Sequence, residues 1–378
     1  MKKIGIYIHI PFCRQKCGYC DFYSTRWNDY DEKKFTEAVI SEIKSYNDKL
    51  NGNCIADTIY FGGGTPSIVN PENLSRIMEN LHQTIEIDDY PEISMEANPN
   101  TLTVEKLKAY REIGINRISV GIQSLNDKIL KKIGRIHNSN EAIDSINMCK
   151  QTGFKNINAD VMFNIPGQSI KDVESTLSKI IRTGIRHISF YSLKLENGTP
   201  MYDLEKNGKI TMPDENLERE MYYEGRSLME KNNIFQYEIS NFAESGFECR
   251  HNLKYWNQEE YIGIGPSAHS FLNSIRYSNS QNLYLYCENS FKGIFERIIE
   301  EELDKDDLMI EYIMLQLRLT EGLNAEDFKK KFSTDFKETY KMQINYLVKN
   351  DLLEINDNFV RLTKKGMDIS NYVIEEFM

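Results

Sequence analysis

The sequence predicts an α/β fold in which short β-strands alternate with amphipathic helices, followed by a smaller domain at the C-terminal end. Three observations lead to this prediction. Six apolar, β-rich runs recur along the first half of the chain. Helical patterns lie between several of them, which favours parallel strands joined by right-handed crossovers. The last part of the chain instead combines one helical pattern with two neighbouring β-like runs.

The six predicted strands share a high content of β-branched and aromatic residues. They cover residues 4–10, 58–61, 92–97, 117–122, 157–163 and 187–193. Six repeats are fewer than a complete eight-stranded barrel requires. They fit an incomplete barrel as well as a doubly wound sheet, and periodicity does not separate the two.

Three helical patterns support the alternation. The first repeats apolar residues from Phe35 to Leu50 at a spacing close to 3.6. The second begins with Asn70 as a suitable N-cap and Pro71 at the first helical position. The third begins at Ser169. We therefore expect helices at these places between the strands.

The C-terminal part departs from this alternation. Residues 216–286 are rich in aromatic side chains, and the charged stretch 296–307 predicts a domain boundary. We therefore divide the chain into residues 1–295 and 296–378. A helical pattern over 310–317 and β-like runs at 352–355 and 359–362 are typical of a winged helix. From residue 323 onward, ten acidic residues face nine basic ones, which favours a packing or interaction module over DNA binding.

Composition limits the function further. The net charge of −11 argues against a non-specific nucleic-acid surface. The seven cysteines are an odd number without disulfide-like pairing, which predicts a reducing, cytoplasmic environment. No run of about 18 apolar residues predicts a membrane span.

Three cysteines near the N-terminus are the most informative residues. Cys13, Cys17 and Cys20 have the spacing C-x3-C-x2-C and directly follow the first predicted strand. Three thiolates can hold three corners of a [4Fe-4S] cluster and leave one iron open to a small molecule. A zinc site completed by His9 or Asp21, or a set of structural thiols, is the alternative.

Polar residues also follow the other predicted strands. Gly63, Gly64 and Thr65 lie in the run 61–67, where glycines allow a ligand to approach the backbone or simply form a turn. Glu96 ends an apolar run and needs a partner there, either a ligand hydroxyl or an arginine. Three further polar residues are candidates: Gln123 ends the fourth predicted strand, Arg135 follows it, and Asp160 lies in the fifth. In barrel folds the active site lies at the carboxyl ends of the strands.

The cysteine spacing, together with the flanking sequences Tyr-Ile-His-Ile-Pro-Phe-Cys and Tyr-Cys-Asp-Phe, resembles the radical S-adenosylmethionine (SAM) superfamily. Within it, the chain resembles the HemN/HemW branch of oxygen-independent coproporphyrinogen III oxidases and haem chaperones. The resemblance implies an open (β/α)6 partial TIM barrel with a C-terminal winged-helix-like domain. It also implies a [4Fe-4S] cluster on the three cysteines, which chelates SAM and cleaves it with one electron. The residues that match SAM-contact positions of this branch are Tyr7, Gly63, Gly64, Thr65, Glu96, Gln123, Arg135 and Asp160.

One further motif resembles the chaperone side of the branch. The run Arg-His-Asn-Leu-Lys-Tyr-Trp at 250–256 contains H-N-x-x-Y-W, which is linked there to haem binding. His251 could supply an imidazole to iron, and Tyr255 and Trp256 could pack on a porphyrin face. The alternative is a buried histidine packed among aromatic residues. His269, in the glycine-rich segment that follows, is a weaker candidate.

Three functions remain open on the resemblance. The first is a chaperone that binds haem and transfers it to client proteins, such as respiratory cytochromes. The second is a coproporphyrinogen III oxidase, and the third is a methyltransferase or haem-degrading relative. Phe22 stands where the oxidases carry a fourth cysteine, and only six residues precede Tyr7, where they carry an extension. Both departures favour the chaperone.

The chaperone prediction implies several partners. They are haem, a haem-receiving client, an electron donor and a second copy of the chain in a homodimer. In this interpretation the cluster promotes dimerisation or gates haem transfer.

Overall fold

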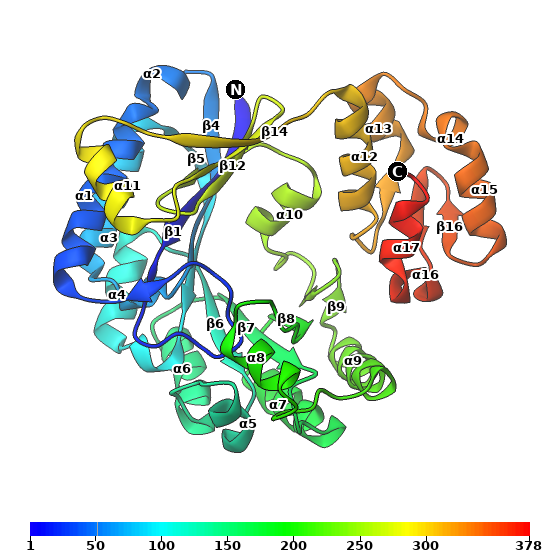
Figure 1. Cartoon of the computed structure of the whole chain (residues 1–378), viewed down its shortest axis with the longest axis horizontal. Helices are drawn as coiled ribbons and strands as arrows, with labels where there is room; N and C mark the ends of the chain where they lie inside the picture. Colours follow the sequence, from blue (N-terminus) through cyan, green and yellow to red (C-terminus); the bar gives the residue numbers. More distant parts are fainter. Residues whose placement is uncertain (51) are drawn as a thin grey trace.

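A twelve-stranded sheet runs through most of the protein, in the order β14-β13-β12-β11-β1-β4-β5-β6-β7-β8-β10-β9 among the described residues (Figure 1). The computed structural model describes residues 1–50 and 52–378. Apolar side chains from the strands and the covering helices form one large buried core. In the described part of the chain, every helix is too short or too polar to cross a membrane.

The centre of the sheet decides between the two predicted architectures. Its six strands are β1 (Lys2–Ile10), β4 (Cys54–Gly63), β5 (Glu86–Ala97), β6 (Arg117–Gln123), β7 (Asn156–Phe163) and β8 (His187–Ser192). They are parallel, and each pairs with the next one along the chain. A doubly wound sheet would reverse its strand order at a switch point. The uninterrupted order therefore confirms an open partial barrel.

Helices connect these strands on the outer side of the sheet (Figure 1). They are α1 (Asp29–Ser45), α2 (Asn47–Leu50), α3 (Pro71–Thr84), α4 (Val104–Ile113), α5 (Asp127–Lys132), α6 (Ser139–Gln151) and α7 (Ile170–Arg182), with short 3-10 turns at Pro66–Ile68 and Pro99–Thr101. Asn70 caps α3 by accepting from the Glu72 N–H, as predicted. Ser169 caps α7 in a reciprocal pair with Asp172. The predicted helix over 35–50 ends at Ser45, and Leu50 belongs to α2.

The segment between β8 and the C-terminal domain, which includes the aromatic-rich residues 216–286, completes the two edges of the sheet. It contains α8 (Pro200–Lys206), α9 (Glu215–Glu230), β9 (Phe235–Gln236), β10 (Asn241–Ala243), α10 (Arg250–Trp256), β11 (Tyr261–Ile264), β12 (His269–Leu272), β13 (Ile275–Asn279), α11 (Leu283–Phe291) and β14 (Arg297–Glu302). Strand β11 pairs in parallel with β1, and β10 pairs antiparallel with β8. A small pair, β2 (Phe12–Cys13) and β3 (Thr25–Arg26), brackets the cysteine loop.

The C-terminal domain has its own hydrophobic core, which begins at Met309. Its elements are α12 (Lys305–Gln316), β15 (Leu323–Asn324), α13 (Ala325–Phe332), α14 (Phe336–Thr339), α15 (Lys341–Lys349), β16 (Leu353–Asn356), β17 (Phe359–Leu362), α16 (Lys364–Asp368) and α17 (Ser370–Glu375). The order β15-β17-β16 with the preceding helices gives the predicted winged-helix-like fold.

The predicted boundary before residue 296 needs one correction. Strand β14 follows that position and pairs with β13, so it extends the large sheet. The charged composition of this strand suggested a domain boundary, but the strand lies at the exposed edge of the sheet, where charges are tolerated. The second core therefore begins after this strand.

Candidate functional site

The three cysteines line one cavity of about 300 Å³ at the carboxyl ends of the parallel strands. Seven of the residues predicted to contact SAM line the same cavity, namely Gly63, Gly64, Thr65, Glu96, Gln123, Arg135 and Asp160. Tyr7 does not line it. Instead, its hydroxyl pairs with His9 Nδ1 at 3.2 Å, and its ring stacks on Tyr60. The barrel thus gathers residues from five strand ends around the cysteine loop.

The cysteines have different surroundings. Cys13 Sγ lies 3.5 Å from Thr65 Oγ1, and the Arg135 guanidinium donates to Cys17 Sγ at 3.6 Å. Burial raises the pKa of Cys20 to about 11, and the thiols of Cys17 and Cys13 add to this. Such a thiol becomes a thiolate when a metal binds, because the cation compensates for the lost solvation.

The donor set fits an iron–sulfur cluster better than one metal ion. Among the described residues, no three His, Cys, Asp or Glu side chains converge as ligands of a single ion. His9, one candidate fourth zinc ligand, uses both ring nitrogens, with Nε2 3.0 Å from the Tyr23 carbonyl. A [4Fe-4S] cluster takes each thiolate on a different iron, so its ligands surround a void. Three thiols around a cavity match this requirement.

Neighbouring parts of the chain leave no room for a side chain at Gly63 or Gly64. At Gly63, where φ is +107°, an added Cβ would lie 2.6 Å from the His9 ring. At Gly64 it would lie 2.6 Å from the Phe12 carbonyl oxygen, and the Gly64 N–H donates to the Ile10 carbonyl at 2.8 Å. Only glycine allows β4 to end this close to the cysteine loop.

Two carboxylates face the cavity without forming an ion pair with any described residue. Glu96 accepts from the Tyr60 hydroxyl at 3.1 Å and from the Gly63 N–H at 3.2 Å. Burial and the nearby Asp160 raise the pKa of Glu96 to about 7. Burial also raises the pKa of Asp160, although Asn158 and Ser119 donate hydrogen bonds to it. Hydroxyl groups or a positive charge on a ligand would stabilise both carboxylates.

Arg135 adds an orphaned donor to the same cavity. Its Nη2 donates to Asn98 Oδ1 at 2.5 Å and to the Gly121 carbonyl. Its buried Nε has no hydrogen-bond partner among the described residues. A buried guanidinium N–H without a partner is costly unless a ligand accepts from it.

Gln123 is held in a strained conformation at the end of β6. Its φ of 65° is uncommon for a residue other than glycine, and the Tyr191 hydroxyl donates to its side-chain oxygen at 3.0 Å. Tyr191 is among the cavity residues that the sequence analysis did not select, as are Tyr60, Asn98 and Asn252. Tyr60, Asn98 and Tyr191 lie near strand ends, which was an available signal, whereas Asn252 reaches the cavity from α10.

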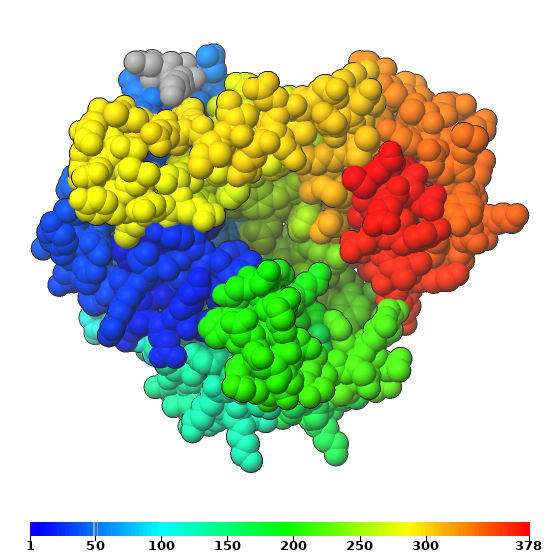
Figure 2. Space-filling view, viewed as in Figure 1, coloured from blue at the N-terminus to red at the C-terminus, as the bar shows by residue number. Residues whose placement is uncertain are grey.

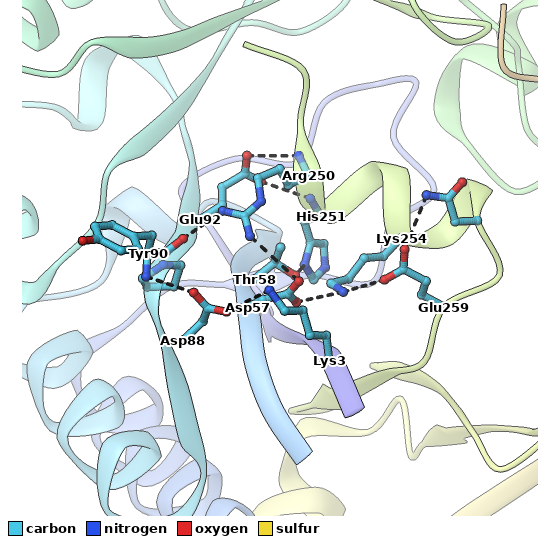
Figure 3. A network of polar contacts seen from close by, with 12 residues as sticks. Lys3, Asp57, Thr58, Asp88, Tyr90, Glu92, Arg250, His251, Lys254 and Glu259 are labelled. Carbon is cyan, nitrogen blue, oxygen red and sulfur yellow. Dashed lines mark hydrogen bonds and ion pairs between the residues drawn. The ribbon is translucent and has the colours of Figure 1, made fainter. Parts of the chain in front are cut away.

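Helix α10, which carries the H-N-x-x-Y-W motif, is anchored to the sheet by charged side chains (Figure 3). Glu92 on β5 accepts from the N–H groups of Arg250 and His251, at 3.0 and 3.1 Å. This places a carboxylate at the helix N-terminus, where it is favourable. Lys254, on the next turn, lies 2.8 Å from Asp57 and 2.7 Å from Glu259.

His251 is closed off by protein groups. It is 1 % exposed, with Nδ1 2.8 Å from Thr58 Oγ1 and Nε2 2.9 Å from the Tyr255 hydroxyl. Burial lowers its pKa to about 3, so the ring is neutral. Neither nitrogen is free to bind iron in this arrangement, which agrees with the alternative of a packed histidine.

The remaining predicted haem residues lie outside the cavity as well. The Tyr255 hydroxyl is occupied by His251, and the Arg318 guanidinium lies over the Trp256 ring, 5.8 Å from its centroid. His269 is exposed and lies 3.2 Å from Glu300. Haem binding by His251, Tyr255 and Trp256 therefore stays a prediction that requires α10 to rearrange.

Comparison with known proteins agrees with the fold and with the cysteine motif. Residues 7–180 match the model of the radical SAM superfamily, and residues 303–369 match the HemN C-terminal domain. The chain is 35 % identical to the haem chaperone HemW of Lactococcus lactis over 378 residues, covering 100 % of this chain and 98 % of the relative. It is 34 % identical to HemW of Bacillus subtilis, with 98 % of each chain covered. Among solved structures, coproporphyrinogen III oxidase (HemN) from Escherichia coli aligns with a TM-score of 0.85 at 20 % identity, over 100 % of this chain and 90 % of that chain.

Proposed function

Because this chain belongs to the radical SAM superfamily and, within it, to the HemW family, we propose that it is a haem chaperone. In this proposal it holds a [4Fe-4S] cluster and SAM at the barrel mouth, binds haem and transfers it to a client protein. The observation that carries the proposal is the similarity to HemW proteins along the whole chain, the C-terminal domain included.

The cavity supports a role for each polar group. Cys13, Cys17 and Cys20 would hold the cluster, which supplies an electron for SAM cleavage when bound. The Arg135 guanidinium, with its unpartnered Nε, suits the SAM carboxylate. Glu96 and Asp160 suit ribose hydroxyls and the sulfonium charge.

A second function has one observation in its favour. The fold is that of a coproporphyrinogen III oxidase, to judge by the TM-score of 0.85. Against this, Phe22 occupies the place of the fourth cysteine and lines the cavity with 64 % of its surface exposed. Phenylalanine offers neither a thiolate nor a proton to a substrate there.

Anaerobically reconstituted protein separates the two functions. Haem is added and the Soret band followed, while a parallel assay supplies coproporphyrinogen III, SAM and a reductant. Stoichiometric haem binding without protoporphyrinogen formation is expected. Turnover to protoporphyrinogen would establish the oxidase instead.

The finer parts of the proposal concern partners. We expect the client to be a haem protein such as a respiratory cytochrome, and we expect an electron donor and a homodimer. Two contacts support a link between cluster and cargo: β3, which follows the cysteine loop, pairs with β2, and the Trp27 N–H donates to the Cys13 carbonyl at 3.0 Å. Changes at the cluster can therefore reach the surface beyond the loop.

A further inference from the structure

A groove of about 420 Å³ lies between the partial barrel and the C-terminal domain. The ends of β7 and β8 form one side, α9 forms the second, and α16 of the C-terminal domain forms the third. The surface is visibly hollowed between the green segments of the barrel and the red C-terminal helices (Figure 2). Tyr191 lines both this groove and the cysteine cavity, so the two are neighbours.

Aromatic rings form much of the groove. The rings of Phe163 and Phe190 are 4.5 Å apart, and those of Tyr222 and Tyr223 are 5.3 Å apart. All four residues line the groove. Phe163 and Phe190 are only 5 % and 1 % exposed, so they lie beneath the groove, and the half-buried rings of Tyr222 and Tyr223 provide the apolar surface that a macrocycle can contact.

The charges in the groove favour an anion. Its lining contains four cationic side chains, Lys194, Arg219, Arg226 and Lys364, and three carboxylates, Glu215, Glu218 and Asp368. Each carboxylate already has a protein partner. Arg219 lies 3.5 Å from Glu215 and 2.9 Å from Asp368, and the Ser192 hydroxyl donates to Glu218 at 2.5 Å.

Two of the cations remain available for a ligand. The exposed Lys194 side chain makes no hydrogen bond or ion pair with the described residues. The Lys364 ammonium lies over the Tyr223 ring, 4.1 Å from its centroid, and forms no ion pair with any described carboxylate. One of these lysines belongs to the barrel and the other to the C-terminal domain, so a ligand with two carboxylates could bridge them.

The groove also contains a soft iron ligand. Met367 on α16 lines it, with the thioether sulfur 4.0 Å from Arg226 Nη1. A thioether is a known axial ligand of haem iron. By contrast, a larger groove of about 950 Å³ between α1 and α11 presents Lys34 against Asp31 and Glu288, which disfavours a dianion.

On the basis of the proposed function, we infer that haem binds in the groove between the barrel and the C-terminal domain. In this arrangement the porphyrin packs against Tyr222 and Tyr223, its propionates pair with Lys194 and Lys364, and Met367 faces the iron. The open groove leaves part of the haem exposed, which suits its transfer to a client. The inference also gives the C-terminal domain a function, because the cargo site would be incomplete without α16.

Haem titration of the full-length, reconstituted protein tests the groove. Lys194→Glu/Lys364→Glu is expected to weaken haem binding about tenfold, because both propionate partners become repulsive. The matched control is Lys155→Glu/Lys349→Glu, which changes the net charge equally at exposed sites outside the groove. Haem dimethyl ester is the second probe, and its affinity should be the same for all variants.

The outcomes separate this inference from the proposed function. Wild-type protein that binds no haem would refute the chaperone itself. Wild-type protein that binds haem, with an unchanged affinity in Lys194→Glu/Lys364→Glu or an equal loss in the control, would overturn the groove alone. Met367→Leu should shift the Soret band of bound haem, and an unshifted band would overturn the assignment of Met367.

Discussion

The cysteine cavity and the junction at which Glu92, Asp57 and Thr58 hold α10 against the sheet both contain buried polar groups beside β4 and β5, but these groups are partnered differently. In the cavity, Arg135 Nε has no partner, and Glu96 holds a pKa of about 7. At the junction, Glu92 accepts from two helix N–H groups, and both His251 nitrogens are paired. Trp256 Nε1 and Arg117 Nε also lack a partner among the described residues, but neither residue lines the cysteine cavity. An unpartnered polar group therefore indicates a ligand site where it faces a cavity, whereas groups that pair with one another stabilise the fold. The predictions below test this difference.

The largest expected effect concerns the cavity. Cys13→Ser/Cys17→Ser/Cys20→Ser should lose the iron–sulfur cluster completely, since hydroxyl groups are poor ligands for these irons. Loss of the charge-transfer absorption after anaerobic reconstitution and a negative iron assay would show this. The thermal unfolding of the unreconstituted protein should change little, because the thiols line a cavity rather than the core.

The same variant tests whether cluster and cargo are coupled. If the cluster promotes dimerisation or gates haem transfer, the variant should be impaired in both. Normal dimerisation and haem transfer would show that the two are independent. Cys54→Ser, which changes a thiol outside the cavity, is the control.

The next effect concerns the junction. Glu92→Ala should lower the free energy of unfolding by about 3–5 kcal/mol, because two helix N–H groups lose their acceptor and the buried Arg117 nearby loses a counter-charge. Denaturant unfolding of the apoprotein measures this. The exposed Glu220 on α9 supplies a control, and its replacement by alanine should change stability by less than about 0.5 kcal/mol. A similarly small loss for Glu92→Ala would contradict a structural role for the junction.

The sequence predicted the cavity better than the junction for a physical reason. All six strands were found, and parallel strands in chain order bring their carboxyl ends together, so Glu96, Gln123 and Asp160 had to meet. Helix α10 is placed by contacts that are distant in sequence, such as Arg250 with Glu92. No local pattern reveals that His251 turns toward Thr58, or that Asn252 faces the cavity.

A smaller effect is expected for His251→Ala. It removes two hydrogen bonds and leaves the Thr58 and Tyr255 hydroxyls without their partner, which should cost about 2–3 kcal/mol of stability. Haem affinity should not change if haem binds in the groove lined by α9 and α16. Soret titration decides between the two haem sites. A selective loss of haem affinity in a folded His251→Ala variant would support haem binding at the H-N-x-x-Y-W motif instead of the groove.

The last effect, which vanishes at low pH and is the only one that depends on pH, concerns Glu96→Gln. The folded-state pKa of Glu96 is about 7, above its ordinary value of 4.5, so the folded protein keeps this proton where the unfolded chain has lost it. The group therefore makes no difference below pH 4.5, and it destabilises the wild type increasingly as the pH rises toward 7. Glu96→Gln should nearly equal the wild type in stability at pH 4.5 and exceed it by about 3 kcal/mol at pH 8. Urea unfolding at both pH values measures the difference, and Glu220→Gln should show none.

If Glu96→Gln were instead less stable at pH 8, the Glu96 carboxylate would contribute to the fold as Glu92 does, and the contrast between cavity and junction would not hold at this residue. The same variant should bind SAM more weakly, because a carboxylate that is costly to the apoprotein stabilises the complex.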